Sequence, residues 1–393
     1  MTDVAPLSAD TVAILLLCGH FGEKPAGVKP LTPAEFHGFA LWLEDKGLAL
    51  GALVEGDPER VSQGRRDTPL SLDRVAALLD RAGQLSQAME KWLREGIWVI
   101  SEKDADYPAR LGDRLRSAGS PLLFGAGPRA VLGHGGVCIV GSRDSAKAGL
   151  AFARSLGAKC GSQDLTVVSG YMRGVNREAV AAALASGGTA VYVLSDSLEK
   201  ALAQKRNREA LASGALALVT PFSPDTRFSV ANAMRSSKYQ YALADVAVIV
   251  ETRQHGGVWS GADENRNEGW VPAFVRAGED MAPGNTALLH LGLRPITQED
   301  VDGCQDIRDC FLALSSVSAD SEGVDVPGSH PNLYAVFLTE LESFAAAAPR
   351  TEAEIMDHFG LERAQARAWL KRARGDGRIG KSGRPARYGP VGG

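Results

Sequence analysis

Four apolar runs in the middle of the chain are each followed at once by a turn rich in glycine and serine. The runs are residues 137–140, 165–168, 190–194 and 246–250, and helical stretches separate them. Short unbroken apolar runs that alternate with helices are typical of a parallel β-sheet covered on both faces. We therefore expect an α/β fold, with an extended Rossmann-like parallel sheet over residues 129–313.

The four turns should gather at one edge of this sheet. In parallel sheets ligands bind outside the carboxyl ends of the strands, which is where these turns lie. Small residues there let backbone N–H groups approach a phosphate, and the N-terminus of the next helix adds a partial positive charge. The turn residues that we expect to contribute are Gly141, Ser142 and Arg143, then Ser169 and Gly170, then Ser195, Asp196 and Ser197, and finally Gly256, Gly257 and Ser260. The pattern predicts a site for a phosphorylated ligand.

The segments on either side of the sheet have a different character. Residues 1–128 are predicted to form a mainly helical N-terminal domain, with Thr32-Pro33-Ala34-Glu35 as one of its helix starts. Residues 314–331 have linker composition. Residues 332–393 are predicted to fold as helix, short helix, longer helix and hairpin, the order of a winged helix-turn-helix.

Within the sheet domain, we also expect one helix over residues 198–213 and a loop over residues 280–290.

The C-terminal segment is strongly basic although the chain as a whole has a formal charge of −4. Between Leu361 and Gly393 there are nine Lys and Arg residues against two acidic ones. Such an asymmetry favours contact with nucleic acid, and the alternative is a module that docks on a protein. The residues expected to touch DNA are Arg363, Arg367, Lys371, Arg374, Lys381 and Arg384.

Other classes of protein are disfavoured by the sequence. The five cysteines are scattered and form no C-x-x-C pair, so we expect neither a zinc site nor a disulfide framework, and no cofactor. No apolar run is long enough to span a membrane, and the apolar stretch near the N-terminus follows acidic residues, which makes it a poor signal peptide. We expect a cytoplasmic protein.

Three motifs in a fixed order resemble those of the DprA/Smf family of DNA-processing proteins. They are V-C-I-V-G-S-R at residues 137–143, V-V-S-G-Y-M-R-G-V-N at residues 167–176, and A-L-A-S-G-G-T at residues 183–189. The family pattern there is V-G-S-R, S-G-x-A-R-G-I-D and A-L-x-x-G-G. The segments D-Y-P at residues 106–108 and P-L-L-F-G at residues 121–125 are also similar to the region that precedes the Rossmann-like domain in that family.

The resemblance implies a protein that binds single-stranded DNA, protects it and assists its loading onto a RecA-type recombinase, as a homodimer and without catalytic turnover. It implies that Arg143 and Lys238 pair with phosphates, and that Arg173, beside Gly174, does the same from the second turn. Tyr241 or Tyr171 would stack on a base, although packing in the core is the alternative role for Tyr241. Ser142, Ser169 and Ser260 would donate through their hydroxyl groups.

The sequence departs from the family pattern at several positions, and these departures keep two other functions open. Asn176 stands where the pattern has aspartate. The segment from Lys238 to Asp245 is similar to the R-N-K-x-I-Y-x-L-A-D of a divergent DprA-like branch, but Ser236-Ser237 replaces its Arg-Asn pair. One alternative is a sensor of a free nucleotide, for example in phage defence. The other is a nucleotide phosphoribohydrolase, because Gly256-Gly257 through Glu264 is similar to the motif of the LOG-like enzymes, with Lys238 upstream. Trp259 in place of a motif glycine, and Ser237 in place of an arginine, argue against hydrolysis.

Overall fold

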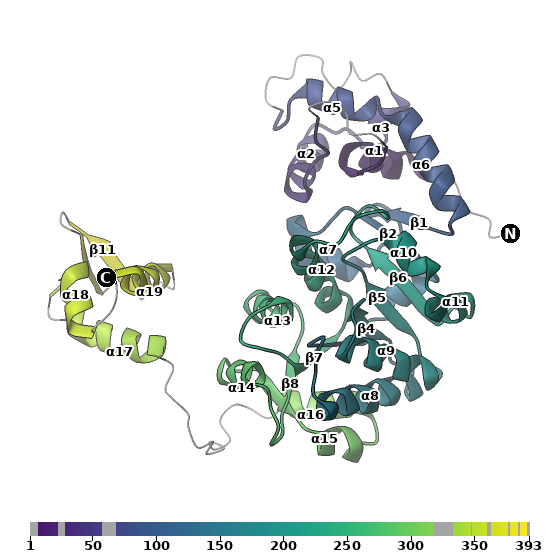
Figure 1. Cartoon of the computed structure of the whole chain (residues 1–393). Helices are drawn as coiled ribbons and strands as arrows, with labels where there is room; N and C mark the ends of the chain where they lie inside the picture. The colour runs from purple at the N-terminus through teal and green to yellow at the C-terminus, as the bar shows by residue number, and fades with distance from the viewer. Residues whose placement is uncertain are drawn as a thin grey trace. The chain divides into compact units, whose positions relative to one another are not determined.

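The computed structural model describes residues 7–22, 28–56, 68–316, 333–346, 348–359, 363–375, 378–383 and 386–390. The chain divides into two compact units, Met1–Ser318 and Ala319–Gly393 (Figure 1). Each unit is described by itself below.

The larger unit is built on one nine-stranded sheet. Its strands are β1 (Trp98–Ser101), β2 (Leu122–Ala126), β3 (Val137–Gly141), β4 (Val167–Gly170), β5 (Ala190–Val193), β6 (Leu216–Thr220), β7 (Val246–Glu251), β8 (Ala273–Arg276) and β9 (Arg294–Ile296). Their order across the sheet is β1-β2-β6-β5-β4-β3-β7-β8-β9. The pairs from β6 to β9 are parallel, whereas β2 runs antiparallel to both β1 and β6. The predicted α/β fold with a Rossmann-like sheet is confirmed.

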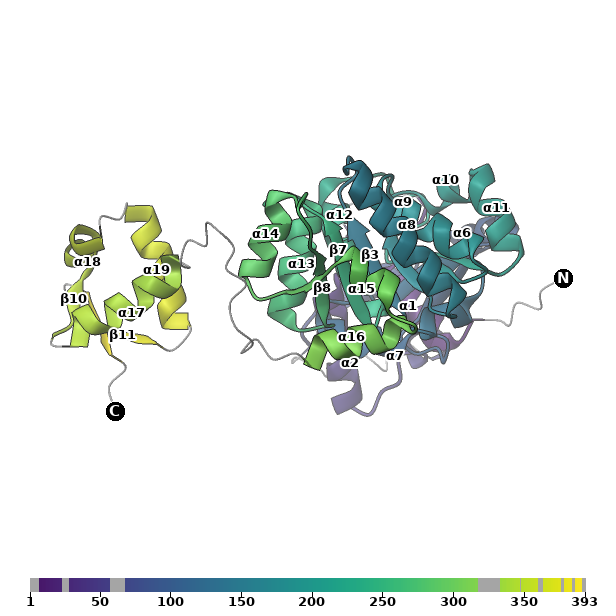
Figure 2. The same cartoon turned by 90° about the horizontal axis from the view of Figure 1, so that it is seen from below.

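Both faces of the sheet are buried, because successive side chains along each strand enter different apolar clusters. On β3, Val137 and Ile139 pack into one cluster, and Cys138 and Val140 pack into the other. The first cluster contains side chains of α8 and α9, and the second contains side chains of α7, α12 and α13. Figure 1 shows α12 and α13 on one side of the strands and α8 and α9 on the other, and Figure 2 shows the latter two side by side.

Helices and two 3₁₀ turns connect the strands of the sheet and follow its last strand. They are α7 (Ala109–Leu115), the 3₁₀ turns η1 (Arg116–Ala118) and η2 (Arg129–Gly133), α8 (Lys147–Ser162), α9 (Val175–Ala185), α10 (Leu198–Ala203), α11 (Lys205–Ala212), α12 (Val230–Leu243), α13 (Gly257–Glu268), α14 (Pro283–His290), α15 (Gln298–Gly303) and α16 (Ile307–Ser316). None of the described helices is both long and apolar enough to cross a membrane.

Two local expectations were wrong. The predicted helix over residues 198–213 is broken at Gln204, whose backbone is extended, because the buried amide of Asn207 donates to Ala201 O and to the hydroxyl of Tyr171. The predicted loop over residues 280–290 contains α14, which begins with Pro283 and buries Leu288. Proline fits the first position of a helix because its fixed φ is already helical and its missing N–H would have had no partner there.

The N-terminal helices are α1 (Ala9–Cys18), α2 (Pro33–Asp45), α3 (Ala52–Glu55), α5 (Leu72–Leu79) and α6 (Ala82–Arg94). The predicted helix start at Thr32 is a capping box in which Thr32 and Glu35 bond to each other's backbone N–H groups. Residues 98–126 were assigned to the helical domain 1–128, yet they supply strands β1 and β2, which add an antiparallel edge to the sheet. The helices and the sheet therefore form one compact unit.

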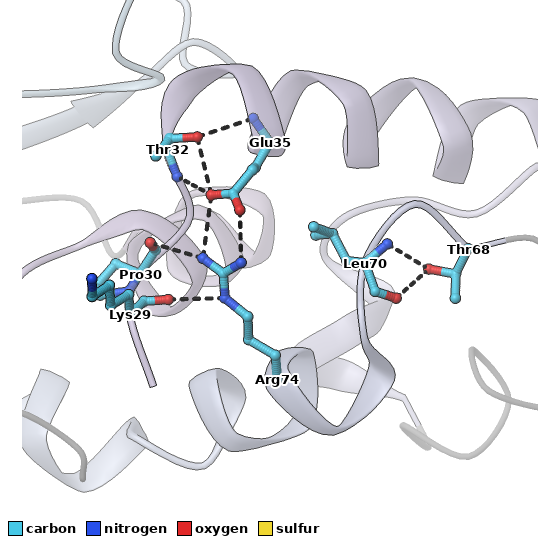
Figure 3. A network of polar contacts seen from close by, with 7 residues as sticks. All are labelled: Lys29, Pro30, Thr32, Glu35, Thr68, Leu70 and Arg74. Carbon is cyan, nitrogen blue, oxygen red and sulfur yellow. Dashed lines mark hydrogen bonds and ion pairs between the residues drawn. The ribbon is translucent and has the colours of Figure 1, made fainter. Parts of the chain in front are cut away.

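Arg74 on α5 ties this helix to α2 and to the segment before it (Figure 3). Its guanidinium donates to the Glu35 carboxylate at 2.7 and 3.2 Å and to the carbonyls of Lys29 and Pro30. The hydrogen bond from Arg74 and those from Thr32 lower the pKa of Glu35 to about 2. All three nitrogens of the guanidinium are thus committed to holding the helices together.

The smaller unit contains α17 (Leu333–Ala346), β10 (Arg350–Thr351), α18 (Glu352–Phe359), α19 (Arg363–Gly375), β11 (Ile379–Ser382) and β12 (Arg387–Pro390). Its strands pair in the order β10-β12-β11 around a core that includes Phe337, Ile355 and Leu370. The winged-helix interpretation of this element order stays a prediction. Residues 314–316 of the predicted linker lie in α16, and residues 317–331 lie outside the described part of the chain.

Candidate functional site

The order of strands creates a switch point between β3 and β7. From β3 the chain builds outward through β4, β5 and β6, and then it returns to the other side of β3 to add β7, β8 and β9. At such a point the loops that follow the two adjacent strands lead away in opposite directions, which leaves a crevice at the carboxyl edge. The first and fourth predicted turns follow β3 and β7, so the structure brings them together here.

The first turn presents a free cation. The N–H of Ser142 donates to Glu251 O at 2.8 Å, which joins the turn after β3 to the end of β7. Arg143 is exposed, and within the described residues it forms no ion pair or side-chain hydrogen bond. Its guanidinium is therefore available to an anion at the carboxyl edge.

The second turn packs against the first. Gly174 has φ of 80°, and a Cβ at this position would lie 2.3 Å from Arg143 O, so both the backbone conformation and the close approach require glycine. Arg173 is exposed, and its guanidinium lies 4.0 Å from the Asp144 carboxylate, both in solvent. A contact of this kind is worth little, so Arg173 stays available to a ligand.

Asn176, on the first turn of α9, holds the first two strand ends in place. Its side chain is buried, its Oδ1 accepts the N–H of Gly141 at 3.2 Å, and its Nδ2 donates to Gly170 O at 3.2 Å. Gly170 has no room for a side chain, because a Cβ would lie 3.0 Å from the amides of both Asn176 and Gln240. This amide is the structural reason that the ends of β3 and β4 stay aligned.

The predicted role of Ser169 was wrong. Its side chain is fully buried and its hydroxyl donates to Ile139 O at 2.6 Å, which leaves it unable to reach a ligand. The sequence could not distinguish a serine that faces the edge from one that faces the neighbouring strand.

The fourth turn opens α13 with an uncapped N-terminus. Gly256 and Gly257 are exposed and no side chain caps the helix, so the N–H groups of its first turn face outward. Ser260 is half-buried, and its own N–H closes the turn on Gly256 O. Because backbone donors and the helix dipole both favour an anion, this end of α13 is suited to phosphate.

The N-terminus of α8, by contrast, is already occupied by a carboxylate. Glu251 is half-buried, and its Oε2 accepts the N–H of Ala146 at 3.1 Å. The same oxygen would lie 2.7 Å from a Cβ at Gly149. Glu251 therefore occupies the position that a phosphate takes in many Rossmann-like folds.

Lys238 and Tyr241 do not line the edge as predicted. The Lys238 ammonium donates to Ala118 O in η1, and burial lowers its pKa. Tyr241 is completely buried against the sheet, and burial raises its pKa well above the usual value. Tyr241 packs in the second core cluster, and nothing in the helical periodicity could have separated this face of α12 from an exposed one.

An exposed group at the start of α12 went unrecognised as a site. Phe228, Val230 and Met234 are about half or more exposed, at 52%, 70% and 48%. Arg235 lies beside them, with its guanidinium 5.2 Å from the centroid of the Phe222 ring. The signal that could have found them is the apolar residue at 228, just before a helix that begins at the carboxyl edge.

In the smaller unit, the predicted cations lie mostly on α19. Arg367, Lys371 and Arg374 are exposed on one side of this helix, and Arg367 pairs with Glu352 at 2.9 Å. Lys381 on β11 is exposed, with its ammonium 5.8 Å from the Tyr388 ring centroid. The Arg363 side chain and all of Arg384 lie outside the described residues.

The chain matches one family model and is similar in fold to several solved structures. Residues 98–301 match the family model described as DNA recombination-mediator protein A. The DNA processing protein A of Streptococcus pneumoniae is similar in fold, with a TM-score of 0.58 and 18% identity over 76% of this chain and 98% of that one. The Helicobacter pylori protein of the same name, solved to show its single-stranded DNA binding mode, gives a TM-score of 0.45 and 18% identity over 56% of this chain and 97% of that one. No curated protein matches the sequence.

Proposed function

The chain belongs to the DNA recombination-mediator protein A family of DNA-processing proteins, and from this premise we propose that it binds single-stranded DNA at the carboxyl edge of its sheet. We propose further that it protects the strand and assists its transfer to a RecA-type recombinase, as a homodimer and without catalytic turnover.

The observation that carries the proposal is the grouping of free cations and open backbone donors at the switch point. Arg143 and Arg173 project from adjacent turns, and the uncapped N-terminus of α13 follows the neighbouring strand. A single strand presents phosphates at intervals along a flexible backbone, so it can engage several such groups at once.

A base platform is also required, and Phe228 replaces Tyr241 in that role. Its ring is 52% exposed, whereas Tyr241 is completely buried. Base–aromatic stacking is worth about 1–3 kcal/mol per base and tolerates any sequence. Arg227 directly precedes Phe228, and Arg235 lies on α12. Both are exposed and can hold the adjoining phosphates.

The geometry supports a polymer ligand better than a mononucleotide. The Glu251 carboxylate repels a phosphate from the N-terminus of α8, so of these two helix ends only that of α13 is open to a mononucleotide, whereas a strand can also engage Arg143 and Arg173. The hydrolase interpretation needs Lys238 and Glu264 at the ligand, yet Lys238 is bonded to Ala118 O. Both observations support the proposed single-stranded DNA binding over the nucleotide-sensor and hydrolase alternatives.

Fluorescence anisotropy with labelled oligo-dT, at two salt concentrations and with excess AMP as competitor, tests the proposal. We expect tight binding that weakens steeply with salt and that AMP barely reduces. Full competition by AMP, or no binding to the oligonucleotide, would replace it with a nucleotide-binding function. Product analysis with AMP would then separate an enzyme from a sensor.

A further inference from the structure

A second group of exposed cations lies on α10 and α11. Lys200, Lys205, Arg206 and Arg208 are all exposed, and within the described residues none of them forms an ion pair. Arginines elsewhere in the same unit commonly have acidic partners, as Arg110 does with Asp245, Arg154 with Glu178 and Arg266 with Asp263. Exposed cations without acidic partners are available to the phosphates of a nucleic acid.

The acidic residues near this group leave its positive charge largely uncompensated. Glu199 on α10 already pairs with Lys91 on α6 at 2.6 Å. Asp196 is half-buried in the turn after β5, and Glu209 is exposed on α11 without a partner in the described part of the chain. Three cations within the four residues 205–208 therefore dominate the exposed side of α11.

A continuous set of contacts connects α11 to the switch point. The Arg206 guanidinium lies 5.1 Å from the Tyr171 ring centroid and donates to its hydroxyl at 2.7 Å. Tyr171 directly follows Gly170, and two residues further on is Arg173, next to Gly174, which touches Arg143 O. The cations of the first two turns and those of α11 thus lie along one stretch of the carboxyl edge.

We propose that α10 and α11 form a second segment of the binding path, which holds the sugar-phosphate backbone of a strand longer than the switch point alone can accommodate. This inference rests on the proposed single-stranded DNA binding. The Arg206 guanidinium lies over the Tyr171 ring, and Arg206 and Asn207 each donate one hydrogen bond to its hydroxyl, so Tyr171 supports the segment and does not stack on a base. The ligand of the second segment is backbone phosphate, without base readout.

The test compares two oligonucleotide lengths, oligo-dT of about 5 and about 15 nucleotides, which bracket the usual site sizes of one binding fold. The variant is Lys205→Gln with Arg208→Gln, which removes two cations and leaves the Arg206–Tyr171 contact intact. Arg266→Gln with Arg308→Gln is the matched control, since Arg266 lies in the last turn of α13 and Arg308 begins α16, away from the carboxyl-edge turns. Thermal unfolding of both variants confirms that they fold.

For the longer oligonucleotide we expect the slope of log affinity against log salt to fall by about 1.4, since each single-strand phosphate contact contributes about 0.7. The slope for the shorter one should match that of the unmodified protein. If the double variant behaves as the control does at both lengths, the second segment is wrong while the switch-point site stands. If the unmodified protein binds neither oligonucleotide, the proposed function itself fails.

Discussion

A single amide sets the geometry of the first two turns. Asn176 accepts from Gly141 N–H and donates to Gly170 O at the same time, which a carboxylate cannot do. An aspartate at this position, as in the family motif, would place a carboxylate against Gly170 O. Asparagine instead links the ends of β3 and β4. Because its side chain is buried, the change removes no group that could contact a ligand.

Asn176→Asp should lower the free energy of unfolding by about 1–3 kcal/mol, because it removes a buried hydrogen bond and places a charge against a carbonyl. Urea denaturation at neutral pH measures the change. Asn267→Asp, on the exposed side of α13, is the matched control and should stay within about 0.5 kcal/mol of the unmodified protein. Equal stability of the two variants would show that the bridge does not stabilise the fold.

Removal of the Arg143 and Lys238 side chains should have opposite effects on DNA binding and on stability. Arg143→Ala takes away an exposed cation, so we expect weaker oligo-dT binding, a salt slope lower by about 0.7, and an unchanged unfolding free energy. Lys238→Ala takes away the ammonium that is bonded to Ala118 O, so we expect a loss of about 1 kcal/mol in stability and normal binding. Anisotropy and urea denaturation on both variants decide the assignment, and the reverse pattern would return Lys238 to the site.

At the scale of elements, two helix N-termini meet the switch point and only one of them is open. Glu251 caps α8 through Ala146 N–H, whereas α13 begins at exposed glycines without a side-chain cap. The chain thereby directs an anion toward the β7–α13 side of the crevice.

Glu251→Gln should separate these two effects of the carboxylate. Loss of the charge at the helix N-terminus should lower stability by about 0.3–1 kcal/mol. Loss of the repulsion should at the same time raise the affinity for oligo-dT and allow AMP to compete more strongly. Unchanged AMP competition would mean that Glu251 does not exclude phosphate from α8.

The junction of α2 and α5 should make stability depend on pH in the acid range. Glu35 has a folded-state pKa of about 2, below its ordinary value of 4.5, so its ion pair stabilises fully above about pH 4.5 and the effect is lost as the pH falls toward 2. The carboxylate is partly exposed, so we expect about 1 kcal/mol. Arg74→Gln should be less stable by at least that amount at pH 7 in urea denaturation. The difference from the unmodified protein should narrow by about that amount as the pH falls toward 2, and the part that comes from the bonds to the Lys29 and Pro30 carbonyls should remain.

At the scale of the whole molecule, cations occur in both compact units. Lys371 and Arg374 are exposed on α19 of the smaller unit, and Arg143 lies in the larger one. If both units bind DNA, we expect a higher affinity for a strand long enough to engage both, because the second contact is then intramolecular.

Lys371→Gln with Arg374→Gln should weaken binding of an oligo-dT of about 30 nucleotides and leave one of about 5 nucleotides unaffected. Combined with Arg143→Ala, the two fold-changes should multiply for the longer strand. Anisotropy at fixed salt gives the affinities of the unmodified protein, of each variant and of their combination. Equal losses at both lengths would show that the smaller unit does not extend the DNA contact.

The apolar runs and the turns that follow them were enough to predict the parallel sheet and the edge proposed for binding. The length of an apolar run and the glycines that end it are local properties of the sequence. Gly141, Arg143, Gly174 and Gly256 were placed at that edge from the sequence alone. The capping box at Thr32 was predictable for the same reason, since it involves groups only three residues apart.

Tertiary structure decided which side chains reach the solvent at that edge. Ser169, Lys238 and Tyr241 follow the same residue patterns as ligand contacts, yet packing turns them toward Ile139 O, Ala118 O and the core. The role of Glu251 depends on a contact across 105 positions of sequence, and that of Arg206 on one across 35. The local sequence determines the spacing of apolar residues and the type of turn. The direction in which a side chain points depends on neighbours that only the folded sheet brings within reach.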